Sequence, residues 1–177
     1  AFATQTRRDD AAGDAAPRRG GVTDAGRYGC SMTENLPPRS RLVHDALRAA
    51  GIGGEIVVLP DAASTAPLAA AALGVEVGAI ANSLVFFSDG EPLLVMTSGA
   101  HRVDTAALAE RLGRGRIQRA TPEQVREATG QAIGGVAPTG HPSPLTTVVD
   151  EALAAYPQIW AAGGTPHTVF PLTFDDL

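Results

Sequence analysis

The chain has 177 residues, of which 44% are hydrophobic and only 5% are aromatic. This length suits one globular domain, and its core must be built mainly from alanine, valine, leucine and isoleucine. The net charge of −5 disfavours a protein that grips long nucleic acid without sequence preference, although it leaves room for a small basic patch. All 14 basic residues are arginines, so any mechanism that needs a lysine is excluded.

Several protein classes can be set aside from the sequence. No run of about 18 apolar residues is present, so no membrane span is expected. The single cysteine, Cys30, excludes an internal disulfide and a cysteine-based zinc site. The first ten residues lack the apolar stretch of a secretory signal, and a reducing, cytoplasmic location is therefore expected.

Residues 1–36 form a region of different composition. They contain five arginines and five acidic residues, together with many glycines and alanines, and show no apolar periodicity. Such a segment buries too little surface to offset its ordering entropy. We expect a disordered extension over 1–36 and one folded domain over 37–177; an arginine-bearing arm that binds RNA is the alternative for the extension.

The first half of the domain is punctuated regularly. Ser40 is expected to cap a helix over 40–50, a short strand is expected at 55–59, and Ser64 is expected to begin an alanine-rich helix that ends at Gly74. Strands at 83–87 and 93–97 flank Asp89-Gly90, which is a strong hairpin signal.

The second half alternates helices and strands irregularly. Asp104 is expected to cap a helix over 104–112, a brief strand includes Ile117, and Thr121 begins a helix with a capping box that ends at Gly130. A strand at 146–149, a short helix from Asp150 and strands near 159 and 169 complete the chain. The irregular order and the hairpin predict an α+β fold with a mixed sheet and packed helices.

The glycine-rich loop at 134–142 is the most informative candidate site. Gly134 and Gly135 let the backbone approach a ligand and direct amide donors at it, as the oxyanion of an ester under attack requires. A bulky side chain at Gly135 is expected to block the ligand without unfolding the protein. The alternative is that this loop, and the second glycine pair Gly163-Gly164, are simple turns.

Other polar residues offer weaker signals. Asp150 ends an apolar run and is either a general base or the cap of the next helix. His101, which follows Ser98 and Gly99 after the hairpin, is the histidine best placed for a cleft. The four histidines lack the spacing of metal ligands, and no Gly-x-Ser-x-Gly elbow supports a serine hydrolase. We expect neither a metal nor a cofactor.

Arginines cluster in the second half of the chain. Six of them could contact phosphates: Arg102, Arg111, Arg114, Arg116, Arg119 and Arg126. Acidic residues are interleaved with them, so an ordinary solvated helix face explains the cluster equally well.

Read in order, these pieces resemble the YbaK family, also called the prolyl-tRNA-synthetase-associated domain. The similarity covers about residues 40–177. Its matching segments are 69–74, 80–86, 103–104 with Leu108 and 112–113, then Glu123, Val125 and 129–130, the loop 134–140, Val149-Asp150 and Gly163-Gly164.

The resemblance implies a mixed, partly barrel-like sheet surrounded by helices. It implies an enzyme that hydrolyses the ester between a wrong amino acid, such as alanine or cysteine, and the acceptor end of tRNA. It makes tRNA-Pro the candidate acceptor and prolyl-tRNA synthetase a candidate partner, with no role for membrane or DNA. Backbone amides hold the carbonyl, and water or the substrate's own ribose takes part in the attack.

By position, the resemblance assigns catalytic roles to Asn82, Gly134, Gly135 and Asp150. Residues expected to bind substrate are Ser98, Gly99, His101, Val136, Pro138, Gly140, His141, Gly163 and Gly164. The chain departs from the family at Asn82, where the family usually has a lysine. A neutral amide can hydrogen-bond but supplies no charge. Either asparagine is the working residue there, or the protein is a noncatalytic member of the fold that binds a tRNA end, a nucleotide or a protein partner.

Overall fold

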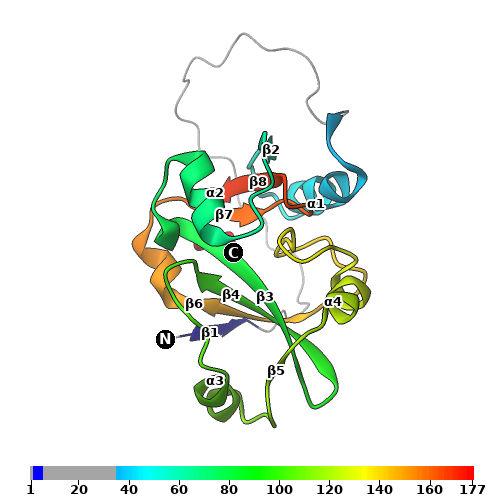
Figure 1. Cartoon of the computed structure of the whole chain (residues 1–177), viewed down its shortest axis with the longest axis vertical. Helices are drawn as coiled ribbons and strands as arrows, with labels where there is room; N and C mark the ends of the chain where they lie inside the picture. Colours follow the sequence, from blue (N-terminus) through cyan, green and yellow to red (C-terminus); the bar gives the residue numbers. More distant parts are fainter. Residues whose placement is uncertain (1, 6–34) are drawn as a thin grey trace, which may run out of the picture.

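A computed structural model describes residues 2–5 and 35–177 (Figure 1). Its helices are α1 (Pro38–Ala49), α2 (Ala66–Leu73), α3 (Thr105–Leu112), α4 (Pro122–Thr129) and the 3-10 helices η2 (Val77–Ala79) and η3 (Glu151–Ala155). Its strands are β1 (Phe2–Gln5), β2 (Val57–Val58), β3 (Ile80–Ser88), β4 (Glu91–Ser98), β5 (Gln118–Arg119), β6 (Thr146–Asp150), β7 (Ile159–Ala162) and β8 (Thr168–Leu172).

The strands form one mixed sheet in the order β1-β6-β4-β3-β7-β8-β2. The short strand β5 lies off this path and pairs with the end of β3 that β7 leaves unpaired. The β3–β7 and β4–β6 pairs are parallel, and the others are antiparallel. Among the strands that the structure describes, β1 and β2 end the sheet, so it stays open and does not close into a barrel. The predicted α+β class with a mixed sheet is confirmed.

The β3–β4 hairpin forms at the predicted turn. Asp89 and Gly90 have φ angles of 54° and 83°, the left-handed conformations that a tight two-residue hairpin turn requires. The register sets Asn82 opposite Thr97 and Phe86 opposite Leu93. In Figure 1, β3 runs diagonally through the domain from the level of α2 to this turn.

Two of the four caps predicted for the α-helices are correct. The Asp104 side chain accepts hydrogen bonds from Ala106 and Ala107 at the start of α3, and Thr121 and Gln124 form the predicted capping box of α4.

The caps proposed for the first two helices are wrong. Helix α1 already begins at Pro38, and Ser40 lies buried inside it, 3.0 Å from the Thr168 hydroxyl. Helix α2 is capped by Thr65, one residue after the predicted Ser64. In both cases a proline in the first turn marks the start of the helix, because its fixed φ suits that position.

Apolar side chains pack on both faces of the sheet. The largest cluster joins α1, α4 and β8 to one face of β3 and β4, through residues such as Val43, Val125, Phe170, Val85 and Met96. A second cluster packs α3 against the other face, and a third lies under α2. The site described below lies where α2 and the sheet meet.

The expectation of disorder over 1–36 falls mainly on residues outside the described part of the chain. Two pieces of that region are described: Phe2–Gln5 pair with β6 as β1, and Leu36 is buried in the largest cluster. No helix among the described residues is long and apolar enough to cross a bilayer.

Candidate functional site

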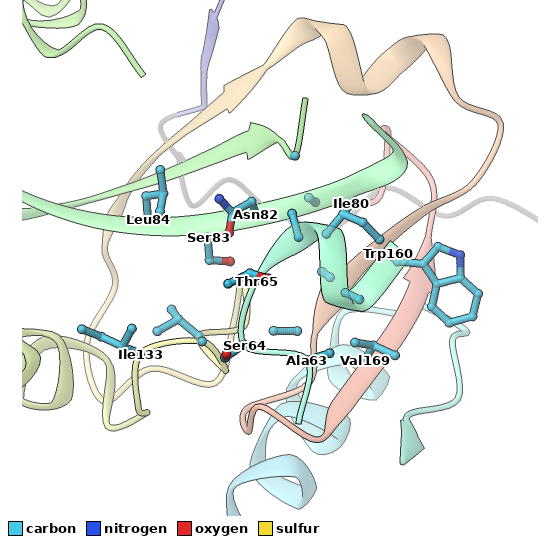
Figure 2. A pocket seen from close by; sticks show the side chains of 18 of the residues that line it. Ala63, Ser64, Thr65, Ile80, Asn82, Ser83, Leu84, Ile133, Trp160 and Val169 are labelled. Atoms are coloured by element: carbon cyan, nitrogen blue, oxygen red, sulfur yellow. The ribbon is translucent and has the colours of Figure 1, made fainter. Parts of the chain in front are cut away.

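A cavity opens beside the middle of β3. It offers about 300 Å³ to water-sized molecules, and it is bounded by β3, the start of α2, the loop at 133–136 and the strands β7 and β8. Figure 2 shows Asn82, Ser83 and Leu84 on β3, with Ser64 and Thr65 from the start of α2 and Ile133 from the loop around the same space.

The cavity exists because the sheet has a gap. On one edge, β3 pairs with β7 only through Ile80 and Ala81, and with β5 only through Phe86 and Phe87. The Val85 carbonyl accepts a bond from Ala120 on the β5 side. Residues two positions apart on a strand direct their N–H and C=O groups to the same edge. Because Val85 faces the edge that carries β5, Ser83 faces the same edge, and its N–H and C=O lie in the gap between β7 and β5. The strand thus offers an extended ligand one backbone donor and one acceptor.

The glycine loop contributes through Gly134 and Val136. Gly134 has a φ of 84° and lies so close to Ser64 that an added Cβ would contact the Ser64 side chain and backbone. Within the described part of the chain, the amides of Gly134 and Val136 donate to no protein acceptor. Both residues line the cavity, so these amides are candidate donors to a carbonyl or oxyanion bound there.

Gly135 lies against another loop of the protein, whereas the sequence analysis expected it to face a ligand. Its amide already donates to Ala132 O at 3.0 Å, and an added Cβ would overlap the backbone of Thr165 and Pro166. The glycine is needed because two loops of the protein meet there. A side chain at 135 must therefore displace this contact between the two loops, so its effect on the fold stays to be tested together with its effect on ligand binding.

A buried glutamine holds the loop in place. The Gln131 side-chain oxygen accepts from the Ala137 amide at 2.6 Å, and its nitrogen donates to the Thr139 carbonyl at 3.2 Å. This residue was missed in the sequence, because a glutamine after a helix-ending glycine has no distinguishing pattern.

The cavity carries little charge. Among its described lining residues there is no aspartate, glutamate, histidine or cysteine, and the single charged side chain is Arg119 on β5. Hydroxyl groups are present on Ser64, Thr65, Ser83 and Thr168, but no base lies in the lining to activate them. The arrangement suits hydrogen bonding of a substrate better than attack by a protein nucleophile.

Asp150, His101 and Ser98 form a separate cluster at the ends of β4 and β6. The buried Asp150 carboxylate accepts from the Ser98 amide and the Thr97 hydroxyl, both at 3.2 Å, and from His101 Nδ1 at 2.7 Å. It also accepts from the Ala152 amide at 3.1 Å and so caps η3. None of the three predicted residues lines the cavity.

The environment keeps Asp150 ionised. Burial by itself would raise the pKa of this carboxyl, but the hydrogen bonds from Ala152, His101 and Ser98 and the charge of a protonated His101 together hold its pKa below the usual value. The His101 side chain, which binds this carboxylate through Nδ1, is itself half-exposed.

The remaining predicted residues lie elsewhere. Gly163 packs against Ile56 and Thr168, and Gly164 packs against Arg39 and Val43. A second cavity of about 680 Å³ lies between α1 and the C-terminus, and its lining includes Pro138, Gly140 and His141. His141 is bonded to the Ala137 carbonyl at 2.9 Å, and burial lowers its pKa more than this bond raises it.

The structure thus brings four predicted residues to the cavity, namely Asn82, Gly99, Gly134 and Val136. It adds lining residues that the sequence did not mark as part of a site, among them Ser64, Thr65, Ile133, Trp160 and Val169. Across the described residues, no group of three histidine, cysteine or acidic side chains is placed to share a metal ion.

Comparison with known proteins identifies the fold. Residues 60–177 match the aminoacyl-tRNA editing domain. The chain belongs to this family. The resemblance to YbaK proteins is confirmed.

Individual relatives agree with this assignment. A crystal structure of a protein proposed as a trans-editing enzyme for prolyl tRNA synthetase is 45% identical, with a TM-score of 0.75 over 80% of this chain and 90% of that chain. The uncharacterized protein YwhH of Bacillus subtilis is 27% identical over 70% of this chain and 78% of its own length. The proline–tRNA ligase of Nitratidesulfovibrio vulgaris strain DP4 is 35% identical over 38% of this chain, which is 12% of that much longer protein.

Proposed function

We propose that the protein is a trans-editing deacylase, which hydrolyses the ester of mischarged aminoacyl-tRNA. The preferred substrates are small amino acids such as alanine or cysteine, and tRNA-Pro is the first acceptor to test. Prolyl-tRNA synthetase is the corresponding partner. The family and the similarity to a proposed trans-editing enzyme support this assignment.

The observation that carries the proposal is the chemistry of the cavity. It combines free backbone amides at Gly134 and Val136, the open edge of β3 at Ser83 and the Asn82 side chain, with no acid, histidine or cysteine in the described lining. Such a site can hold an ester carbonyl and stabilise its developing charge. The attacking oxygen then comes from water or from the ribose of the substrate.

In this proposal Asn82 is the working side chain. Its amide donates a hydrogen bond to the ester or the ribose, in the position where the family usually has a lysine. The substrate pocket is small, and its walls include Ala63, Ala66, Ala69 and Ile80, which suits a short aliphatic side chain.

The test is deacylation of alanyl- and cysteinyl-tRNA-Pro by purified protein. We expect turnover by the natural chain and little change with Asn82→Lys. Asn82→Ala should slow single-turnover hydrolysis by roughly two- to tenfold, the value of about 0.5–1.5 kcal/mol for one neutral hydrogen bond. The matched control is Asn35→Ala, since Asn35 is exposed and lies outside the cavity. If Asn82→Ala hydrolyses as fast as the natural chain, Asn82 has no role in the reaction.

The neutral Asn82 also supports a second candidate, a noncatalytic protein that binds the acceptor end, a nucleotide or a protein partner. In that case aminoacyl-tRNA binds but is not hydrolysed, and Asn82→Lys creates activity that the natural chain lacks.

A further inference from the structure

The cavity has two chemically different ends along β3. At one end Trp160 pairs with Ile80, and at the other Arg119 pairs with Phe86, six positions further along the strand. At about 3.3 Å per residue these ends are roughly 20 Å apart. The Trp160 end is lined by small apolar residues, including Ala63, Ala66 and Ala69.

Arg119 is the charged group at the other end. It is exposed, and within the described part of the chain no carboxylate pairs with its guanidinium. The nearby Arg114, in contrast, lies 3.7 Å from Glu91. A free arginine on the wall of an otherwise uncharged cavity, in a chain of net charge −5, is available to bind an anion.

We propose that Arg119 binds the phosphate that precedes the terminal nucleoside of the substrate, and so fixes the direction in which the aminoacyl end enters the cavity. This inference rests on the proposed function. An aminoacyl ester carries an ammonium group beside its carbonyl and a phosphodiester on the other side of the ribose. The guanidinium attracts the phosphodiester, which it can bind through two parallel hydrogen bonds, and repels the ammonium.

The orientation follows from these charges. The phosphate lies at the β5 end beside Arg119, and the amino acid lies towards Ala66, Ala69 and Ile80 at the α2 end. The ester is then held between them, beside Asn82 and the open edge of β3.

The first test compares two minimal substrates, alanyl-adenosine and the same ester on the dinucleotide CpA. Only the second contains the phosphate. The natural chain should hydrolyse the dinucleotide ester with a kcat/KM on the order of tenfold or more above that of alanyl-adenosine, as expected for one charge-assisted hydrogen bond. Arg119→Gln should remove this preference while leaving hydrolysis of alanyl-adenosine unchanged, and Arg119→Lys should keep part of it.

The matched control is Arg116→Gln, because Arg116 is an exposed arginine of the same segment that does not line the cavity. It should retain the preference. The inference is overturned if Arg119→Gln keeps the preference, or if it slows both substrates equally.

A binding measurement keeps this inference separate from the proposed function. Trp160 is the only tryptophan of the chain and lines the cavity, so its fluorescence should report ligand binding. The probes are amide-linked analogues of the two substrates, which cannot be hydrolysed. Arg119→Gln should weaken binding of the phosphate-containing analogue by about tenfold or more and leave binding of the other unchanged.

The possible results are distinct. Phosphate-dependent binding through Arg119 without hydrolysis of any mischarged tRNA would contradict the deacylase and support the Arg119 contact. Hydrolysis with binding that is indifferent to Arg119→Gln would support the deacylase and refute the contact.

Discussion

Substitution of Gly135 by alanine should destabilise the protein through a contact inside the fold. Gly135 does not have a positive φ, so alanine is acceptable to its backbone, and the effect is purely steric. The new Cβ would overlap backbone atoms of Thr165 and Pro166, which cannot rotate away as a side chain can. Overpacking costs about 1–3 kcal/mol, and rigid neighbours place this site at roughly 2–3 kcal/mol, or about 4–12 °C in Tm for a domain of this size.

The assay is thermal and urea unfolding of Gly135→Ala beside Gly53→Ala. Gly53 also lacks a positive φ, but an added Cβ there has no atom within 4 Å. Gly53→Ala should therefore lie within about 1 kcal/mol of the natural chain, on the stabilising side, because it reduces the entropy of the unfolded chain. Equal Tm values for the two variants would refute the close approach of the two loops.

Two further variants test the local structure. Thr121→Ala removes the capping box of α4 and should cost about 0.5–2 kcal/mol in urea unfolding; an unchanged midpoint would show that the cap is not needed. Asp150→Asn should cost about 1–3 kcal/mol at pH 7, since an amide cannot accept all the bonds that converge on this carboxylate. Because folding lowers the pKa of Asp150, the ionised form contributes stability above the unfolded pKa of about 4 and loses it as pH falls through the folded value. The difference in the free energy of unfolding between the natural chain and Asp150→Asn should consequently narrow in acid. A difference that stays constant down to pH 2 would contradict this account.

The parts of the fold that the sequence predicted are those with local causes. The Asp89-Gly90 turn, the Asp104 cap and the Thr121 capping box depend on residues within four positions of one another, and all three are present. Ser40 shows the limit of this reasoning. Its hydroxyl bonds to Thr168, 128 positions away, and no local pattern predicts that contact.

The site was predicted less well, because its shape depends on the order of the strands. Asn82 lies opposite Thr97, so their side chains share one face of the sheet, and the Thr97 hydroxyl bonds to Asp150 on the next strand, β6. A polar row therefore crosses the sheet from the cavity to the Asp150–His101 pair. The sequence predicted the hairpin that pairs β3 with β4, but not the pairing of β4 with β6, since strand order is set by contacts far apart in the chain. In this arrangement Asp150 fixes Thr97 and Ser98 behind Asn82, and in the proposed function the contacts with the substrate fall to Asn82 itself, the amides of the glycine loop and Arg119.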